Sequence, residues 1–466
     1  MSGPVKSTVR SLHGLNDRIG AGGVIPAVTS RLAGSLSQAG RALRHRNFHL
    51  FFAGQSISLI GTWMTRLATS WLVYRLTHSV LLLGIVTFAG QIVSFALGPF
   101  AGVWVERLDR RKTLLWTQAA AAVQSLTMAA LTLAQVITLW EIIALTVVQG
   151  LINAFDMPAR QSFLVQMLED RNDLSNAIAL NSSMANGGRL IGPAIAGLVI
   201  GAVGEGWCFL IDGVSYFAVI ASLLLMRIRP TDVRRTSGSM LEQIREGWDY
   251  VRTFRPIRTV LLLFALISLM GYSYVVLLPV FAARVLHGGP TTLGWLTGAS
   301  GIGALGSALS LAFRKSVVGL TRMVQVAAAM LGGALILFGL SHTFWLSLVL
   351  MVFVGFGLMQ CASASNTIIQ SLVTEDKRAR VMSYYMMAFF GGAPFGSLLV
   401  SMLAHRIGAP HAVIIIGAFC IAASLWFTLE LPKVSAVVPV KSGNPLDQPD
   451  APDQVDATHQ NVGASF

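Results

Sequence analysis

Charged residues are scarce in this chain, at 12% of 466 residues, and acidic residues are the rarer sign, with 21 Asp and Glu against 34 Lys and Arg. So few charges exclude an intrinsically disordered chain, which stays unfolded through low hydrophobicity and high charge. The only three cysteines, Cys208, Cys361 and Cys420, sit in apolar runs without disulfide or metal-ligand spacing. The sequence also lacks a P-loop, a zinc signature and a nucleophile elbow, so we predict no metal, no cofactor and no enzyme activity.

Apolar residues, in contrast, make up 54% of the chain. A membrane-spanning helix needs about 20 predominantly apolar residues, so the length and composition fit a polytopic membrane protein. The fold class predicted is an all-α membrane protein with twelve transmembrane helices. The predicted spans are 48–72, 82–104, 112–134, 139–157, 178–201, 207–228, 259–283, 293–313, 322–341, 345–365, 383–404 and 411–431.

Basic residues collect on one side of these predicted spans. They fill the N-terminal segment, the loops after the second, fourth, eighth and tenth spans, the central segment and the tail, leaving Arg75, Arg284 and Arg406 on the other side. Because cytoplasmic loops carry an excess of Lys and Arg, both termini are predicted to be cytoplasmic. The net charge of +13 is then explained by contact with the lipid bilayer, and no nucleic-acid partner is expected.

The chain divides into five predicted regions. Residues 1–47 form a basic, flexible cytoplasmic segment, for which a transit peptide is the alternative, and 432–466 form a disordered cytoplasmic tail. Two six-helix bundles, 48–228 and 259–431, flank a cytoplasmic linker, 229–258. In the linker an amphipathic helix, with Leu241, Ile244, Trp248 and Val251 on one face, is predicted to lie on the inner leaflet or on the bundle.

An internal repeat relates the two predicted bundles. GPAIAG at 192–197 has an echo in APFGS at 393–397, and Gly150-Leu151 has one in Gly357-Leu358. The offset covers six spans, an even number, so the halves are predicted to be parallel. Parallel, pseudo-symmetric halves joined by a cytoplasmic linker indicate a secondary transporter, with a small-molecule site at the pseudo-two-fold axis.

The first motif is GVWVERLDRRK at 102–112, between the second and third spans. It resembles the Gly-x-x-x-Asp-Arg-x-Gly-Arg-Arg signature of the major facilitator superfamily, with Gly102, Arg107, Arg110 and Arg111 in place. Glu106 replaces the usual Asp, and Asp109 replaces the second Gly. The resemblance implies a cytoplasmic latch in which an arginine meets an acid at the end of the fourth helix. Asp156, just before Pro158 is expected to end that span, is the candidate acid; the alternative is that Asp156 caps the next segment.

The second motif is GGRLIGPAIAG at 187–197 in the fifth span. It is similar to the Gly-Pro antiporter motif of the superfamily's exporters at Gly188, Gly192, Pro193 and Gly197. Glycines allow helices to approach closely, and this packing role alone also accounts for them. Arg189 lies near the predicted midplane, where a guanidinium is costly unless it is paired or faces water, so a functional role is predicted.

Further charged residues lie inside or beside the predicted spans. Arg66 in the first span and Asp212 in the sixth have similar predicted depths, which makes them possible partners. Glu141, at the outer end of the fourth span, is another possible partner of Arg66. Together with Arg189 these residues are the predicted substrate and proton pathway, and a structural counter-ion is the alternative role of Asp212.

Segments such as GTWMTRLATSWLVYRLTHS, AFDMPARQSFLV and DLSNAIALNSS closely resemble the enterobactin-exporter-like branch of the major facilitator superfamily. The resemblance implies a bacterial inner-membrane exporter, coupled to protons and working by rocker-switch alternating access. Siderophores, macrolides and other drugs are the implied cargo, and no required protein partner is predicted. Two alternatives remain: an uncoupled facilitator or flippase for a lipid or lysolipid, and a non-transporting membrane sensor or scaffold.

Overall fold

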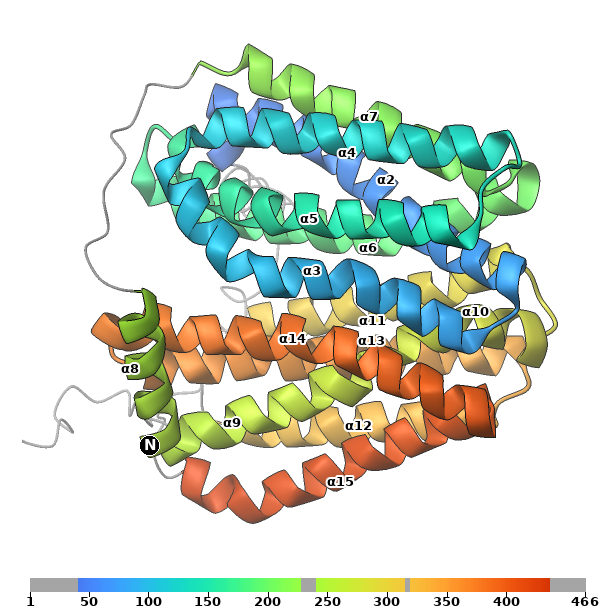
Figure 1. Ribbon diagram of the computed structural model, residues 1–466. Coiled ribbons are helices and arrows are strands. Elements are labelled where there is room, and N and C mark those ends of the chain that lie inside the picture. Colours follow the sequence, from blue (N-terminus) through green and yellow to red (C-terminus); the bar gives the residue numbers. More distant parts are fainter. Residues whose placement is uncertain (1–40, 228–239, 315–318, 436–466) are drawn as a thin grey trace, which may run out of the picture.

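The computed structural model describes residues 41–227, 240–314 and 319–435, and every regular element in these ranges is a helix (Figure 1). The predicted N-terminal segment up to residue 40, part of the predicted linker and the tail from residue 436 lie outside the described residues. The long helices are α2 (Arg46–Thr77), α3 (Val80–Arg107), α4 (Arg110–Leu133), α5 (Leu139–Leu164), α6 (Leu174–Val203), α7 (Glu205–Leu225), α8 (Met240–Thr253), α9 (Arg255–Leu266), α11 (Pro290–Ala312), α12 (Leu320–Leu340), α13 (Phe344–Leu372), α14 (Glu375–Ile407) and α15 (Ala409–Ser435).

Between α9 and α11 the helix is irregular. It continues through the π turn Ile267–Gly271, the 3-10 turn Ser273–Leu277, α10 (Leu278–Val280) and a second π turn, Phe281–Val285. Pro279 in α10 has no backbone N–H to donate, which breaks regular helical hydrogen bonding at this point. Three further 3-10 turns are Arg41–Arg44, Val165–Met167 and Arg171–Asp173.

Ten helices of the described ranges are long and apolar enough to cross a membrane, which confirms an all-helical membrane fold. The helices α2 and α11 do not meet that criterion, although they have 32 and 23 residues and pack among the others. Arginines at positions 46, 66 and 75 make α2 more polar than its neighbours. The total of twelve spans and the side on which the termini lie therefore stay predictions.

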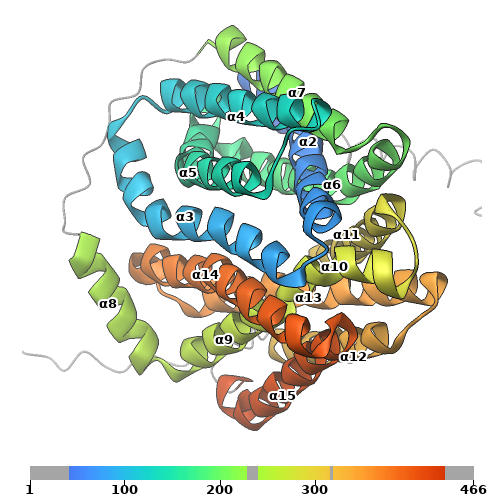
Figure 2. The ribbon, with the colours of Figure 1, turned by 45° about the vertical axis from the view of Figure 1, so that its right-hand side comes forward.

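The contacts between helices repeat from one half of the chain to the other (Figure 2). α4 packs on α7 as α12 packs on α15, and α3 packs on α5 as α11 packs on α13. The helix ends repeat as well: His78 and His287 both have φ of 48°, and Gly204 and Gly408 have φ of 92° and 87°. The two prolines of the sequence repeat, Pro193 and Pro394, lie inside α6 and α14, which are equivalent helices in this scheme.

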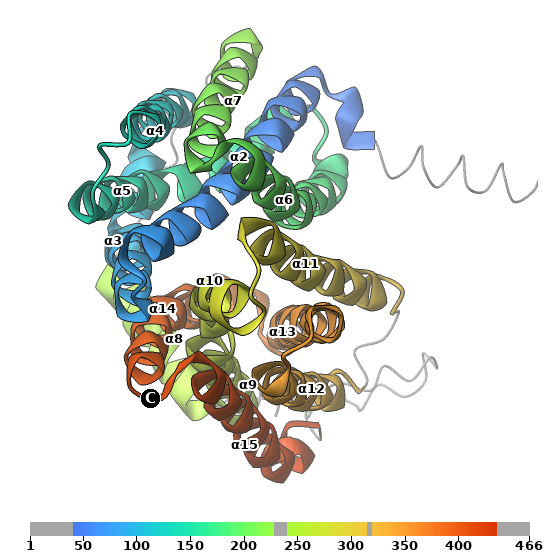
Figure 3. The ribbon, with the colours of Figure 1, turned by 90° about the vertical axis from the view of Figure 1, so that its right-hand side faces the viewer.

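The two halves meet along two helix pairs, α6 with α11 and α3 with α14. Figure 3 looks along the bundle and shows α2 to α7 on one side and α9 to α15 on the other. We call the end of the bundle that carries the α3–α4, α7–α8 and α13–α14 connections the basic end, after its arginines and lysines. The end that carries the α2–α3, α6–α7 and α14–α15 connections is called the opposite end.

The end of the fourth span differs from its prediction, and the position of the linker helix decides between two predicted alternatives. Pro158 does not end the fourth span, since α5 continues through it to Leu164; a bundle of neighbouring helices tolerates a proline at such a position. The amphipathic linker helix, α8, packs on the bundle: the rings of Trp248 and Tyr384 of α14 are 6.0 Å apart, and Val251 is buried.

Candidate functional site

Two arginines on different helices converge on one tryptophan. The guanidinium carbon Cζ lies 4.8 Å from the centre of the Trp63 ring for Arg66 of α2, and 5.8 Å for Arg189 of α6. Both distances are within the range of a cation–π interaction. Arg66 is exposed and Arg189 is half-buried, and neither forms an ion pair with a described residue. The structure thus unites two predicted site residues through Trp63, which the sequence analysis did not single out.

The glycines of the second motif fix the position of Trp63. A β-carbon at residue 192 would lie 2.5 Å from Trp63 Cβ, and one at residue 188 would lie 3.3 Å from Trp63 Cδ1. Such contacts are too close for most side chains, so Gly188 and Gly192 let α2 and α6 approach and hold the indole beside Arg189. This gives the motif a specific packing role.

Gly197 and Pro193 of the same motif face the other half of the molecule. A β-carbon on Gly197 would lie 3.0 Å from Gly294 Cα, and one on Gly294 would lie 2.7 Å from the Pro193 carbonyl oxygen. The Thr291 hydroxyl donates a hydrogen bond of 3.1 Å to the Gly197 carbonyl. One end of the motif therefore holds α2, while the other end holds α11 across the boundary between the halves.

Asp212 of α7 is buried, with 2% of its surface exposed. Its Oδ2 accepts hydrogen bonds from Thr65 Oγ1 at 2.9 Å and from Ser125 Oγ at 3.1 Å. Its Oδ1 has no hydrogen-bond partner among the described residues. Arg66 is near enough to interact with Asp212 electrostatically but makes no salt bridge with it. Hydroxyl groups, and not the predicted arginine, therefore hold this carboxylate.

Glu141, a possible partner of Arg66 in the sequence analysis, caps a helix in the structure. It is the third residue of α5, and its Oε2 accepts hydrogen bonds from the backbone N–H and the hydroxyl of Thr138, which together form a capping box. It forms no ion pair with Arg66 in the described structure. The Thr-x-x-Glu spacing at 138–141 was the sequence signal for this cap.

Asp156 pairs with Arg160, four residues later in α5, and not with an arginine of the 102–112 loop. Its Oδ1 also accepts hydrogen bonds from Thr117 Oγ1 at 3.0 Å and Gln118 Nε2 at 2.7 Å, and the residue is only 3% exposed. The predicted latch contact is not formed in the described conformation: because α5 continues past Pro158, Arg160 lies one turn away and pairs with the carboxylate. The capping alternative is excluded by the same continuation.

In the 102–112 motif, which joins α3 to α4, two side chains cap helices. Asp109 caps α4 by accepting a hydrogen bond of 3.1 Å from the Lys112 N–H. Arg111 donates to the carbonyl oxygens of Leu223 and Leu224 at 2.9 and 3.0 Å, and thereby caps the end of α7.

The other charged residues of the motif make no described contact with the C-terminal half. Arg107 is exposed, and Arg110 forms no ion pair with a described residue. Glu106 lies in α3, but its side chain lies outside the described part. No contact of this loop with the C-terminal half is among the described hydrogen bonds and ion pairs.

The two halves touch toward the opposite end. Arg284 donates a hydrogen bond of 3.1 Å to the His78 carbonyl, and its Cζ lies 5.9 Å from the Tyr74 ring. In α3, a β-carbon on Gly84 would overlap Ser401 of α14, whereas β-carbons on Gly98 and Gly102, nearer the basic end, would meet nothing within 4 Å. The Arg284–His78 hydrogen bond and the Gly84–Ser401 contact therefore join the halves toward the opposite end.

Comparisons with known proteins agree on one family. A model of the transmembrane secretion effector family matches residues 38–463. The staphyloferrin A transporter of Staphylococcus aureus is 25% identical over 378 residues, which cover 81% of this chain and 94% of that protein. Macrolide efflux protein A of Streptococcus pyogenes is 22% identical, over 80% and 94% of the two chains, and the multidrug efflux pump Tap of Mycolicibacterium fortuitum is 26% identical, over 75% and 87%.

Solved structures share the fold at low sequence identity. A bacterial homologue of the human lysosomal transporter Spinster, in an inward-facing and unoccupied conformation, superposes with a TM-score of 0.67 at 13% identity, over 85% of this chain and 99% of that one. A POT family transporter in complex with a thioalcohol-conjugated peptide gives a TM-score of 0.67 at 12% identity, over 84% and 97%.

Proposed function

The chain belongs to the transmembrane secretion effector family of the major facilitator superfamily, and on this premise we propose that it exports a small molecule that carries an anionic group. It is a multi-pass protein of the bacterial inner membrane and a transporter of small-molecule substrates. Its relatives carry a siderophore, macrolides or several drugs, and among these classes an anionic siderophore or drug is the cargo that fits the proposal. Transport in this proposal changes no covalent bond and needs no metal, cofactor or protein partner.

The observation that carries the proposal is the pair of arginines on Trp63. A guanidinium within the membrane is costly unless it faces water or meets a counter-ion. Arg66 and Arg189 form no salt bridge with a described residue, so a carboxylate or catecholate of the cargo is a suitable counter-ion. The indole beside them offers a flat apolar surface for the rest of the molecule. Such a site favours a mixed, anionic and aromatic or apolar, ligand over a cation.

Asp212 is the acid that we propose couples export to protons. It is buried, its Oδ1 lacks a partner in the described structure, and it interacts electrostatically with Arg66. A proton on Asp212 removes its negative charge and leaves Arg66 free to hold an anion. When the proton is lost, the Asp212 carboxylate competes with the anionic cargo for Arg66. Asp156 and Glu141, the other predicted acids, are occupied by Arg160 and by the cap of α5.

We propose that transport proceeds by rocker-switch alternating access, and the contacts that join the halves toward the opposite end support this proposal. We place the basic end in the cytoplasm, following the distribution of Lys and Arg. In this proposal the contacts of Arg284 with His78 and of α6 with α11 close the outer side. Export requires the reverse state, in which the halves tilt, the outer contacts open and the basic end closes.

The test is transport by purified protein in proteoliposomes, with an anionic catecholate siderophore and a cationic dye as probes. Arg189→Ala is expected to lower transport of the siderophore at least tenfold, and Arg189→Lys to restore part of it, because charge returns without the planar guanidinium. Siderophore transport that survives Arg189→Ala contradicts the anion site. Equal loss of dye and siderophore points to a structural role of Arg189 and also contradicts it.

Proton coupling is tested in the same vesicles by collapsing the pH gradient with a protonophore. Loss of concentrative transport supports coupling. Transport that persists unchanged supports an uncoupled facilitator or a lipid flippase instead. Transport of a fluorescent lysolipid in place of the siderophore then identifies the flippase. A chain that moves none of these probes, in either direction, favours a sensor or scaffold.

A further inference from the structure

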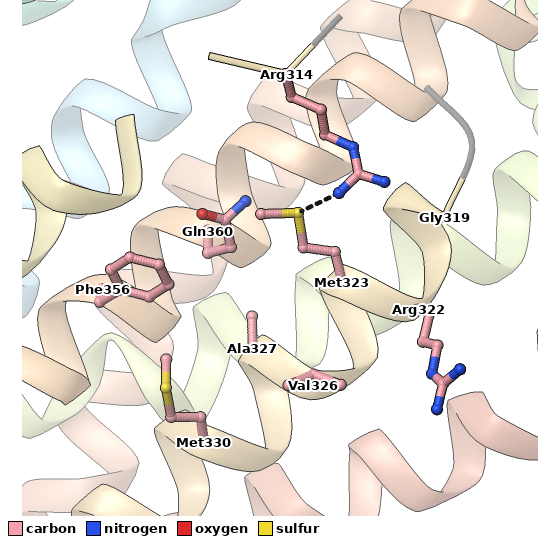
Figure 4. Close-up of a pocket in the computed structure, with 9 residues that line it drawn as sticks. All are labelled: Arg314, Gly319, Arg322, Met323, Val326, Ala327, Met330, Phe356 and Gln360. Carbon is pink, nitrogen blue, oxygen red and sulfur yellow. Dashed lines mark hydrogen bonds between the residues drawn. The ribbon is translucent and has the colours of Figure 1, made fainter. Parts of the chain in front are cut away.

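A groove lies on the outside of the C-terminal half. It has a volume of about 440 Å³ and runs between the end of α11 and the first turns of α12, over α13 (Figure 4). Its floor and walls are Val326, Ala327, Met330 and Phe356, with Met323 toward the mouth. Arg314 and Arg322 stand on the two sides of the mouth at the basic end. The groove is thus apolar inside and cationic at its entrance.

The groove faces outward from the bundle. α12 packs on α13 and α15 and makes no extensive contact with the N-terminal half in the described structure, so its remaining face lies at the periphery (Figure 3). Val326 is 57% exposed and Phe313, at the end of α11, is 83% exposed. In a membrane protein such apolar side chains on an outer face meet lipid. The occupant of the groove therefore comes from the bilayer.

A buried amide at the inner wall also lacks a partner. Gln360 of α13 lines the groove and is only 1% exposed. The Ser307 hydroxyl donates to its Oε1 at 2.8 Å, which fixes the amide, and its Nε2 then has no acceptor among the described residues. An unused buried donor is costly, so an acceptor atom of a ligand fits here. Together with two cations, this donor selects a ligand rich in oxygen acceptors.

We propose that the groove binds an anionic phospholipid of the leaflet at the basic end. Arg314 and Arg322 contact the phosphate, the amide of Gln360 donates to an ester carbonyl, and one acyl chain lies along Val326, Met330 and Phe356. At 1.5 Å per residue, Met330 is about 15 Å deeper than the start of α12, so the groove runs from the head-group region into the hydrocarbon region.

The head group supplies the selectivity. An acyl chain gains little by leaving other lipid tails for an apolar groove, because both surroundings are hydrocarbon. The preference for this lipid over a zwitterionic one must come from the arginines and the amide, and basic pockets between transmembrane helices on the cytoplasmic side have this effect on anionic lipids. The binding requires only that the helices lie in a membrane, and is independent of export.

The experiment is native mass spectrometry of the full chain in detergent, titrated with phosphatidylglycerol or phosphatidylcholine of matched chains. The wild type is expected to retain phosphatidylglycerol at lower lipid concentrations. Arg314→Gln with Arg322→Gln should weaken this preference by roughly fivefold per arginine. Arg227→Gln with Arg245→Gln removes the same charge from exposed positions of the basic end outside the groove, and should leave the preference unchanged. Equal effects of the two pairs would mean that general charge attracts the lipid, and would overturn the site.

Two further arms separate the lipid from other ligands. Val326→Trp fills the groove without changing charge and should lower phosphatidylglycerol retention, whereas Val349→Trp, an exposed residue elsewhere on α13, should not. Glycerol phosphate at millimolar concentration should not displace the lipid. If it competes with full effect, a free anion and not a phospholipid is the ligand. Size-exclusion profiles of all variants show which of them fold, and transport activity does not enter the outcome.

Discussion

Gly192 lies directly against Trp63, so closely that a β-carbon at residue 192 would come within 2.5 Å of the tryptophan Cβ. This contact makes the shape of the arginine site depend on the absence of a side chain in a neighbouring helix. The same helix contains Gly187, where a β-carbon would meet nothing within 4 Å. The two glycines, five residues apart, form a matched pair for experiment.

Gly192→Ala is expected to destabilise the protein by about 1–3 kcal/mol, the usual cost of overpacking, and to lower transport by displacing Trp63. Gly187→Ala should leave stability unchanged or slightly raise it, because alanine favours the helix and the space is free. Thermal unfolding in detergent measures both. A Gly192→Ala protein as stable and active as the wild type would contradict the close contact.

Trp63→Leu is expected to raise KM for an anionic cargo by roughly 2- to 30-fold, because it removes the ring that orients both arginines, and a cation–π interaction contributes about 0.5–2 kcal/mol. Trp63→Phe keeps a smaller aromatic face and should show a smaller increase. Initial rates over a range of cargo concentrations provide the measurement. An unchanged KM in Trp63→Leu would show that the indole does not take part in binding.

Asp156→Asn is expected to cost about 3 kcal/mol of stability, since it leaves the Arg160 guanidinium without its buried partner. The double change Asp156→Asn with Arg160→Gln should recover much of this loss, because no unpaired charge remains. Unfolding temperatures of the two variants make the comparison. If the double variant is less stable than the single one, the hydrogen bonds of Asp156 to Thr117 and Gln118 matter more than the ion pair.

Asp212→Asn is expected to abolish the dependence of transport on a pH gradient while exchange of cargo across the vesicle membrane continues. Glu141→Gln is the control: it removes the charge but keeps a side chain that can complete the capping box of α5, and should leave the pH-gradient dependence intact. Flux with and without an imposed gradient distinguishes the two. Gradient-driven transport by Asp212→Asn would remove Asp212 from the coupling mechanism.

Arg284→Ala is expected to open the opposite end more often, because it removes the hydrogen bond to His78 that joins the halves. A cysteine introduced at Thr291, which contacts Gly197 of α6 across the boundary between the halves, should then react several-fold faster with a membrane-impermeant thiol reagent. The native cysteines are all buried and give little background. Arg75→Ala breaks an ion pair with Glu205 at the same end within one half, and should leave the labelling rate unchanged.

The sequence predicted the helical membrane fold and both arginines of the site, because apolar length and a charge inside a span are local signals. It did not predict Trp63 as their common neighbour, since that depends on how two helices, distant in sequence, pack. The prediction that Pro158 ends the fourth span was wrong, because neighbouring helices tolerate the proline, and the continued helix brings Arg160 within reach of Asp156. The Thr-x-x-Glu spacing of Thr138 and Glu141 is a sequence signal for the helix cap, whereas the prediction for Glu141 was a possible pairing with Arg66.

Gly197 and Gly294 bring the backbones of α6 and α11 together with no side chain between them. Interlocked side chains must leave their rotamers before two helices can pivot, and a glycine pair has none to move. The two helices can therefore stay in contact here while their crossing angle changes. A bulky residue in place of either glycine would interlock with the facing helix and resist this change of angle. It would therefore slow the turnover of the protein even where the cargo still binds.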